Sequence, residues 1–413
     1  MRRVVISGIG LIGPTGGTPE AFWRSLIDGR SGIGRITRFD PTSYACQIGG
    51  EVRDRSYEEL LDPRKLRTTA HVTQLALAAT ELAVRDARGP ATGVVPDLIG
   101  VSIGTALGGA REQEQQHVIL LERGARRVNP FIANGTPNHV AGAEVASALD
   151  ARGPQVTFSN GCPASLQAIA QGASLVATGE LDCCVAGGSE SPLTPMVIAG
   201  MSRTLELATR NDDPAAASRP FDRAHAGMVL SEGSCMLVLE TAELAARRGV
   251  APYAEVLGAT ASCDANGLYG CDPSGDTGAR AIHRLLARVG VSPTDVDYVC
   301  AHANSSPAFD RKETLVIKRA FGESAARLPV SSIKGVLGHP FGASGAFQVA
   351  AACLAIRHQL IPPTHNLESP DPECDLDYVP GLARAAEVRR VMVSSYGYGG
   401  LNAYVMIGEP PRQ

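Results

Sequence analysis

The chain has 413 residues, of which 44% are hydrophobic and 19% are charged, a balance typical of a globular protein with a large core. Its formal net charge of −4 is small, so nothing indicates a nucleic-acid partner, and no apolar run reaches the roughly 18 residues of a membrane-spanning helix. The ten cysteines form neither a disulfide framework nor a CxxC pair, and no secretory signal precedes the first strand. We therefore expect a reduced, cytoplasmic protein without a metal site.

Strand and helix patterns alternate along the first half of the chain. Short apolar runs predict strands, and apolar residues at helical spacing predict helices between them. In chain order these are a strand at Val4–Ile9, a helix at Thr73–Ala87, strands at Leu98–Ile103 and Val156–Phe158, a helix after Cys162, and strands at Cys183–Gly187 and Gly233–Leu239.

Cys162 lies in a sharp turn between a predicted strand and a predicted helix. Pro163 suits the first helical position, because its missing N–H has no intrahelical partner there. Apolar residues from Leu166 to Val176 recur at helical spacing, so the helix is predicted to be buried with its positive end toward the sulfur. Such a placement lowers a thiol pKa and predicts a nucleophile. The alternative from the residues alone is a packed, inert cysteine.

The second half repeats the same rhythm, which predicts two α/β halves at residues 1–250 and 251–413. Its predicted elements, in chain order, are a strand at Tyr253–Ala259, a helix at Gly278–Val289, a strand at Tyr298–His302, a helix at Glu313–Phe321, a strand at Pro329–Ser332, a helix at Ala343–Arg357 and a strand at Val391–Ser395.

Three motifs of the second half carry chemically useful residues. His302 ends an apolar strand, and Lys334 and His339 lie among glycines and small residues just before an alanine-rich helix. The segment Val393–Ala403 pairs a strand with a glycine-rich turn, whose backbone N–H groups can stabilise an oxyanion. Taken singly, each motif also has an ordinary structural explanation.

Together these motifs resemble the beta-ketoacyl synthases of the thiolase superfamily, and most closely the condensing enzymes of dissociated fatty-acid and polyketide synthases. The resemblance covers essentially the whole chain. It implies an α/β, thiolase-like fold in which two duplicated halves form α-β-α-β-α layers. The residues that carry it, by order and approximate spacing, are Cys162, His302, Lys334, His339 and the Tyr396–Asn402 turn.

The resemblance also implies roles for these residues. Cys162 would accept an acyl group from a carrier-bound thioester. His302 and His339 would hold the thioester carbonyl of an incoming malonyl unit and assist its decarboxylation, while Lys334 orients the site electrostatically. The backbone N–H groups of Cys162 and Tyr396 would form the oxyanion hole, and the Tyr396 side chain would gate the pocket.

Further positions follow from the same resemblance. Asp310 and Glu313 match acidic positions after the first histidine motif, and Glu313 is expected to support Lys334 from behind the site. Asn304 and Ser306 replace two threonines that would hydrogen-bond the phosphopantetheine arm. Leu107 is expected to line the acyl pocket, although an ordinary core position is the alternative.

The expected partner is an acyl carrier protein, whose acidic surface suits a basic patch. Arg64, Lys65 and Arg67 are the candidates for docking it, with a solvated surface face as the alternative. No cofactor is expected, because the carrier's phosphopantetheine brings the substrates. The resemblance implies a dimer, formed either with a second copy or with a nucleophile-free sister subunit.

The predicted reaction is decarboxylative Claisen condensation of a Cys162-bound acyl chain with malonyl carrier protein in a polyketide or specialised fatty-acid pathway. Tyr396 stands where thiolases carry a second cysteine, and His339 stands where synthases that start from coenzyme A carry Asn. The altered His302–Ser306 motif keeps two alternatives open. These are a cysteine-dependent acyltransferase that forms a C–O or C–N bond without decarboxylation, and a non-catalytic partner subunit.

Overall fold

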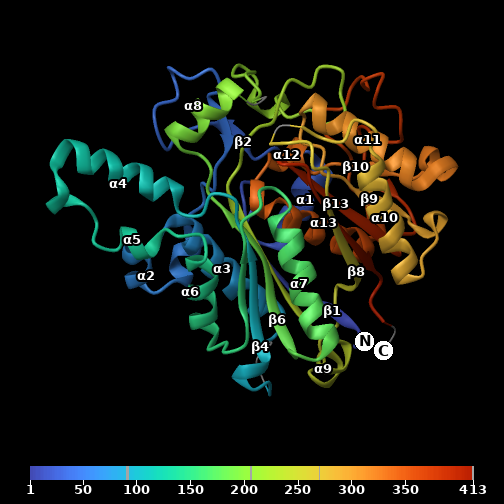
Figure 1. Ribbon diagram of the computed structural model, residues 1–413, viewed down its shortest axis with the longest axis horizontal. Coiled ribbons are helices and arrows are strands. Elements are labelled where there is room, and N and C mark those ends of the chain that lie inside the picture. The colour runs from blue at the N-terminus through green and yellow to red at the C-terminus, as the bar shows by residue number, and fades with distance from the viewer. Residues whose placement is uncertain (90–92, 205–206, 269, 412–413) are drawn as a thin grey trace.

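One ten-stranded sheet runs through the molecule (Figure 1). The computed structural model describes residues 1–89, 93–204, 207–268 and 270–411. The strand order across the sheet is β10-β9-β13-β14-β8-β1-β7-β6-β4-β5. The strands are β1 Val4–Ile12, β4 Ile99–Gly104, β5 Gln155–Phe158, β6 Cys183–Glu190, β7 Gly233–Thr241, β8 Ala254–Cys263, β9 Tyr298–Cys300, β10 Val330–Ser331, β13 Arg390–Gly397 and β14 Leu401–Gly408.

The sheet consists of two copies of one five-stranded pattern. From the centre outward, the first half runs β1-β7-β6-β4-β5 and the second runs β8-β14-β13-β9-β10. In both, the two innermost pairings are antiparallel and the two outermost are parallel. The halves join where Val5 pairs with Glu255 and Ile6 with Ala254. The predicted duplication is therefore confirmed.

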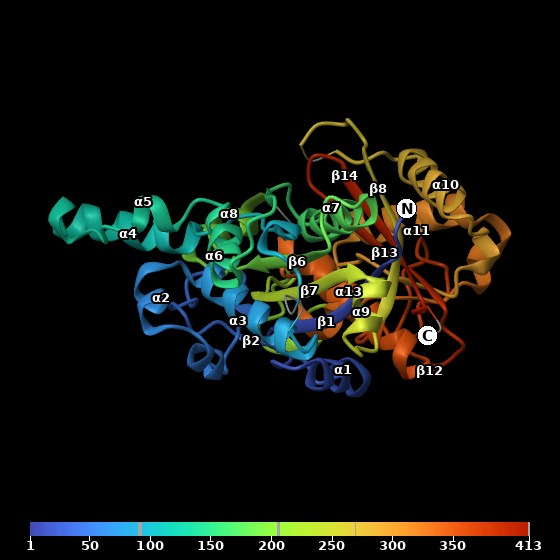
Figure 2. The ribbon, with the colours of Figure 1, turned by 90° about the horizontal axis from the view of Figure 1, so that it is seen from below.

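Helices lie on both faces of each half, and two of them form the middle layer (Figure 2). Helices α7 and α13 pack against each other, and each also contacts strands of both halves. Helices α3 and α6 cover the outside of the first half, and α10, with α11 packed beside it, covers the second. The helices are α1 Pro19–Asp28, α2 Pro63–Thr68, α3 His71–Asp86, α4 Ala110–Arg123, α5 Ile132–Gly135, α6 Val140–Leu149, α7 Ala164–Thr178, α8 Pro195–Thr204, α9 Ala242–Arg247, α10 Asp276–Val289, α11 Pro307–Phe321, α12 Lys334–Leu337 and α13 Ser344–His358.

The side chains explain which helices form the middle layer. Every residue of α13 from Ser344 to Ile356 is buried, as expected for a helix that is apolar and small on all sides. Helix α10 instead buries one face, through residues such as Ile282 and Leu286, and exposes arginines on the other. It therefore lies on the outside of its half.

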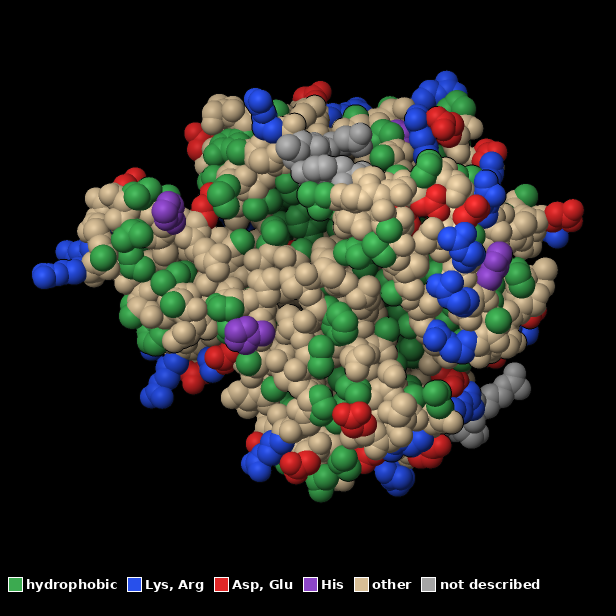
Figure 3. Space-filling model, in the orientation of Figure 1, with side chains coloured by type: hydrophobic (Ala, Val, Ile, Leu, Met, Phe, Trp, Pro, Cys, Tyr) green, Lys and Arg blue, Asp and Glu red, His purple; other side chains and the backbone are tan. Residues whose placement is uncertain are grey.

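An arm formed by α4 and α5 stands away from the body of the molecule (Figure 1). Hydrophobic side chains are scattered over its surface (Figure 3). Large apolar residues here that remain exposed are Val118, Leu120, Leu121 and Phe131. Two short antiparallel pairs complete the fold: β2 Ile33–Arg35 with β3 Ile48–Gly50, and β11 Leu360–Ile361 with β12 Arg384–Ala385.

The predicted elements match the observed ones, with differences at their ends. Helix α11 begins at Pro307, six residues before the predicted start at Glu313. Pro163 has helix-like dihedral angles but caps α7, which begins at Ala164. The predicted boundary after residue 250 falls between α9 and β8 and stays a prediction. Across the described ranges, we find no helix both long and apolar enough to span a bilayer.

The close contact between the two central helices generates the first prediction. A Cβ at Gly345 in α13 would overlap Leu166 of α7 and lie 3.1 Å from its backbone nitrogen. Replacing Gly345 with Ala should therefore reduce the free energy of unfolding by about 1–3 kcal/mol, as measured by urea denaturation. Gly200→Ala is the matched control, because a Cβ at Gly200 meets nothing within 4 Å. Equal stability of G345A and the unmodified protein would contradict this packing.

Candidate active site

The duplication places two equivalent strand-to-helix connections side by side. Cys162 lies between β5 and α7, and His339 lies in the corresponding connection between β10 and α13. Gly342 approaches the backbone of Thr105 and Ala106, and Gly188 approaches Ser165. Small residues on both sides therefore let the two connections meet at one point.

Cys162, His339 and His302 form a compact group at this point. The Nε2 atom of His339 lies 3.1 Å from the Cys162 sulfur. The rings of His302 and His339 are 5.2 Å apart between centroids and perpendicular. Within the described ranges, no protein group hydrogen-bonds Nε2 of His302. A thiol and two imidazoles thus share one buried site, as required for acyl transfer through sulfur.

Lys334 and Glu313 both act on the backbone that carries His302. The Lys334 ammonium donates to the carbonyl of His302. The Glu313 carboxylate accepts the N–H groups of His302 and Ala303 at 2.9 and 2.7 Å, and the Ser394 hydroxyl at 2.5 Å. These two charged groups therefore hold opposite ends of the same residue, and Glu313 influences Lys334 through its charge.

Burial determines the protonation state of the group. It raises the pKa of the Cys162 thiol to about 12, although the charge of Lys334 opposes the shift. Burial and the Lys334 charge also hold the pKa values of His302 and His339 well below the ordinary range. The prediction of a resting thiolate is therefore wrong, because the desolvation of Cys162 outweighs the stabilising effect of the positive end of α7. A neutral thiol instead faces a neutral imidazole that can accept its proton.

Lys334 and Glu313 have displaced pKa values for the same reason. Burial lowers the pKa of Lys334 to about 8 against the opposing charge of Glu313. Burial raises the pKa of Glu313 to about 7 against its hydrogen bonds and the charge of Lys334. Clusters of such displaced values are typical of catalytic sites.

Asp310, Asn304 and Ser306 lie directly beside this group. Asp310 accepts the backbone N–H groups of Asn304 and Phe221 at 3.0 and 2.8 Å. The side chain of Asn304 accepts the Ser306 N–H at 3.1 Å. Both Asn304 and Ser306 are buried, and their contact with a phosphopantetheine arm stays a prediction.

The glycine-rich turn lies against the nucleophile. A Cβ at Gly397 would come within 2.8 Å of the Pro163 ring and 3.5 Å of the Cys162 nitrogen. The oxyanion-hole role of the Cys162 and Tyr396 N–H groups stays a prediction.

The gating prediction for Tyr396 does not fit this geometry. Tyr396 lies inside β13, is fully buried, and packs edge-on against His302 and Tyr404. Tyr398 instead follows the strand and packs in the apolar cluster that contains Cys162. A residue in a turn can move more readily than one held in a ladder of strand pairs, so Tyr398 is the better candidate for a gate.

Leu107 belongs to the same apolar cluster as Cys162, which is consistent with the expected acyl pocket. Sequence reasoning missed the group that holds it. Glu190, at the end of β6, accepts N–H groups of Ala106, Leu107 and Gly342 at 2.5, 3.2 and 3.1 Å. Burial raises its pKa to about 7. This carboxylate ties the Leu107 loop to the His339 connection.

Lys312 was also missed. Its ammonium bonds Asp264 at 2.5 Å and the Asn402 side chain at 2.9 Å, and it lies 5.0 Å from the centre of the Tyr396 ring. Both charged groups are buried. The pair connects α11, the end of β8 and the glycine-rich turn behind the active site. A lysine at one position of a helix gave no signal for this in the sequence.

The candidate docking residues Arg64, Lys65 and Arg67 lie on the short helix α2. Arg64 and Arg67 are exposed, whereas Lys65 is half-buried and forms an ion pair with Glu144 of α6. Two of the three cations are therefore available on the surface. Their contact with a carrier protein stays a prediction.

Comparison with known proteins decides the family. The profile described as "Beta-ketoacyl synthase, N-terminal domain" matches residues 1–245, and "Beta-ketoacyl synthase, C-terminal domain" matches residues 253–368. The chain belongs to the beta-ketoacyl synthase family. The resemblance inferred from the sequence is therefore confirmed.

Relatives of known name extend over nearly the whole chain. The 3-oxoacyl-[acyl-carrier-protein] synthase 2 of Synechocystis sp. is 41% identical over 401 residues, covering 97% of this chain and 96% of that protein. The tetracenomycin polyketide synthase ketoacyl synthase alpha subunit of Streptomyces glaucescens is 39% identical over 416 residues, covering 99% and 97%.

Two solved structures share the fold over 99% of both chains, each with 30% sequence identity. One is the complex of a type II polyketide synthase acyl-carrier protein with its ketosynthase bound to the hexaketide, with a TM-score of 0.90. The other is the ishigamide ketosynthase/chain length factor, with a TM-score of 0.91. The predicted thiolase-like architecture is confirmed.

The neutral thiol makes a testable prediction about reactivity. With a pKa near 12, Cys162 should react with iodoacetamide at a rate that keeps rising between pH 7 and about pH 10, since the thiolate is the reactive form. The rate is measured by peptide mass spectrometry, with exposed Cys263 as the reference for reagent quality in the same samples. A rate that is already constant at pH 7 would mean that Cys162 rests as a thiolate.

Proposed function

We propose that this chain catalyses the decarboxylative condensation of a Cys162-bound acyl chain with malonyl carrier protein, giving a beta-ketoacyl carrier protein. The pathway is a type II polyketide or specialised fatty-acid pathway. The observation that carries the proposal is the 3.1 Å approach of His339 Nε2 to the Cys162 sulfur, with His302 beside them. Family membership and the names of full-length relatives support the same reaction.

The first half-reaction loads the enzyme. The Cys162 sulfur attacks the carbonyl carbon of the acyl thioester while His339 Nε2 accepts the thiol proton. The carbon–sulfur bond to the carrier then breaks, and the leaving pantetheine thiol takes up that proton. No charged thiolate has to exist beforehand, because proton removal accompanies the attack.

The second half-reaction extends the chain. Carbon dioxide leaves the malonyl group, and the electrons of the broken bond form a thioester enolate. Neutral His302 donates an N–H to the enolate oxygen, and neutral His339 does the same in the tautomer that carries its proton on Nε2, the opposite tautomer from the one that accepts the thiol proton during loading. The enolate carbon attacks the acyl carbonyl, the Cys162–acyl bond breaks, and the departing sulfur takes the Nε2 proton of His339, which solvent replaces. Lys334 and Glu313 hold the backbone of His302 during this step.

An acyl carrier protein is the proposed partner, and exposed Arg64 and Arg67 are the proposed docking residues. We also propose that the chain works as a dimer, with a second copy or with a nucleophile-free subunit. The exposed apolar side chains of the α4–α5 arm support the need for a protein neighbour. One related structure is described as a ketosynthase/chain length factor.

Two single variants separate the half-reactions. Cys162→Ala should abolish acyl loading, because the attacking sulfur is absent. His302→Ala should still load, because His339 remains beside the sulfur, but its turnover should fall by about 10²–10³-fold, as is typical for the loss of one oxyanion donor. Intact-protein mass spectrometry follows the acyl group on the enzyme and the product on the carrier.

Exposed Cys263→Ala serves as the control for both variants and should load and turn over normally. Normal turnover by C162A or H302A would overturn the role assigned to that residue. Loading followed by transfer to an oxygen or nitrogen nucleophile, without malonyl consumption, would favour a plain acyltransferase. A complete lack of loading by the unmodified protein, with or without a partner subunit, would favour a non-catalytic role.

A further inference from the structure

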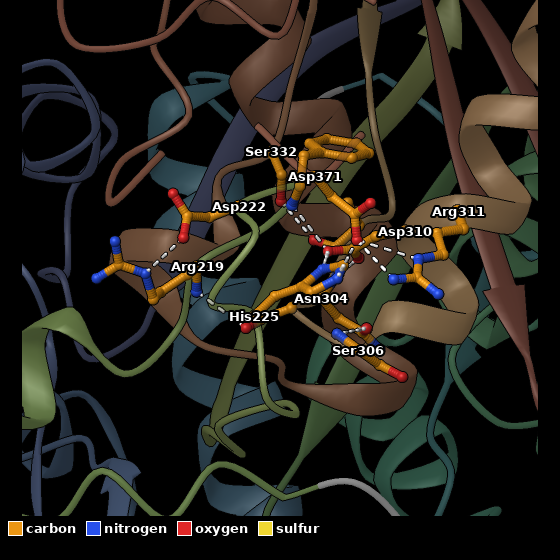
Figure 4. A network of polar contacts seen from close by, with 12 residues as sticks. Arg219, Asp222, His225, Asn304, Ser306, Asp310, Arg311, Ser332 and Asp371 are labelled. Atoms are coloured by element: carbon orange, nitrogen blue, oxygen red, sulfur yellow. Dashed lines mark hydrogen bonds and ion pairs between the residues drawn. The ribbon is translucent and has the colours of Figure 1, made fainter. Parts of the chain in front are cut away.

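His225 lies between two carboxylates next to the active site (Figure 4). Its Nδ1 atom is 3.0 Å from Asp310 and its Nε2 atom is 2.9 Å from Asp371. The side chain is 2% exposed. A neutral imidazole carries only one N–H, whereas the imidazolium donates from both nitrogens. The geometry on both sides of the ring therefore fits the charged form.

Both carboxylates are already used as acceptors by other donors. Asp310 receives the N–H groups of Phe221 and Asn304. Asp371 receives two guanidinium N–H groups of Arg311 at 3.0 and 2.8 Å and the Glu373 N–H at 2.8 Å. The donors around both carboxylates fit ionised acceptors, and a protonated ring completes both sides. Burial outweighs the donors at Asp310 and raises its pKa, whereas at Asp371 the donors outweigh burial and lower the pKa.

The Asp310–His225–Asp371 bridge connects the loop at residues 219–227 to the segment that carries His302. The N–H of Gly227 donates to the Ser305 carbonyl at 2.9 Å, and the N–H of Arg219 donates to the Ser305 hydroxyl at 3.0 Å. Phe221 and Ser305 have φ values of +62° and +73°. Left-handed backbone at non-glycine residues persists only where the surroundings hold it in place. Asp310 restrains this backbone by accepting the N–H groups of Phe221 and Asn304, and His225 holds the Asp310 carboxylate in position.

Other charged groups around His225 are paired among themselves. On its own loop, Arg219 pairs with Asp222 at 3.1 Å and with Glu368 at 3.2 Å. On the neighbouring elements, Arg311 of α11 pairs with Asp371 and Glu373. Burial alone would lower the pKa of His225, but hydrogen bonds and charges from Asp310 and Asp371 raise it above its ordinary value. The imidazolium therefore persists to a higher pH than in an exposed histidine.

We propose that His225 is a pH-sensitive positioning residue for the condensation step, whose protonated ring holds residues 302–306 and thereby His302 in place. This inference rests on the proposed function. When His225 loses its proton, a ring lone pair faces a carboxylate, and one of the two bridging contacts becomes repulsive. The second half-reaction, which uses His302, should then slow. Loading of Cys162, which uses His339, should continue.

The test compares the two half-reactions in the full-length protein between pH 6 and pH 9.5. Cys162 is loaded with an acyl group, and single-turnover extension with malonyl carrier protein is then measured. In the unmodified protein, extension should fall by about tenfold for each pH unit above the His225 midpoint, as the protonated fraction does. The titration of Lys334 near pH 8 adds a second loss.

Two variants isolate the contribution of His225. His225→Arg keeps a positive charge at every pH used, so only the loss from Lys334 should remain. His225→Gln is neutral at every pH, so its extension rate at pH 6.5 should already lie well below that of the unmodified protein at the same pH, while loading stays normal. At higher pH only the loss from Lys334 should be added. If H225R fails to fold, H225Q alone decides the matter.

Side-chain ¹⁵N NMR of histidine-labelled protein reads the bridge independently of activity. The signals absent from H225Q are those of His225, and they should show both ring nitrogens protonated at pH 7. A neutral ring at pH 7, or an H225Q extension rate and pH profile equal to those of the unmodified protein, would overturn the proposal. Failure of the unmodified protein to extend any chain would contradict the proposed function instead, while the NMR result would still judge the bridge.

Discussion

The close packing of helices α7 and α13 is the constraint on which the rest of the structure depends. Each helix follows the fifth strand of one half in the duplicated pattern, and the two lie back to back between the halves. Cys162 precedes one helix and His339 precedes the other. Because Gly345 lets α13 approach Leu166 of α7, the sulfur and the imidazole come within hydrogen-bond distance. The active site is thus a product of the duplication rather than of one local motif.

Burial explains both the chemistry and the architecture around the site. Burial keeps the thiol and both imidazoles neutral at rest, which suits proton transfer during attack and hydrogen-bond donation to an enolate. The charged side chains of the site lie around this centre and form hydrogen bonds with backbone groups. Lys334 and Glu313 hold His302, Glu190 holds the Leu107 loop, and Asp310 holds the segment at Asn304. Such fixed groups preorganise a site without placing a full charge at its centre.

The sequence predicted the alternation of strands and helices and the approximate positions of the elements named from it, because hydrophobic periodicity is a local signal. Other elements, among them α1, α4 and β14, were not predicted. It also identified Cys162, His302, Lys334 and His339, which the structure brings together although up to 177 positions separate the sulfur from its histidine partner. The predicted direction of the Cys162 pKa shift was wrong, because the sequence shows that a helix begins beside the cysteine but does not show how deeply the thiol is buried.

Residues that act through long-range contacts could not be found in the same way. Glu190, Lys312 and Asp371 are single polar residues in ordinary surroundings, and only the fold shows which backbone groups or charges they meet. The gate was assigned to Tyr396 and fits Tyr398 better. The two tyrosines differ by two positions, and the end of β13 decides which of them lies in the turn.

The stoichiometry of one turnover tests the central claim most directly. Acyl-loaded protein is mixed with carrier protein that bears malonyl labelled with ¹³C at its free carboxyl group, and labelled carbon dioxide and extended carrier are counted over time. Decarboxylative condensation at the Cys162–His302–His339 group predicts equal amounts of both, formed at the same rate. Disappearance of the acyl group from Cys162 without release of labelled carbon dioxide would contradict it.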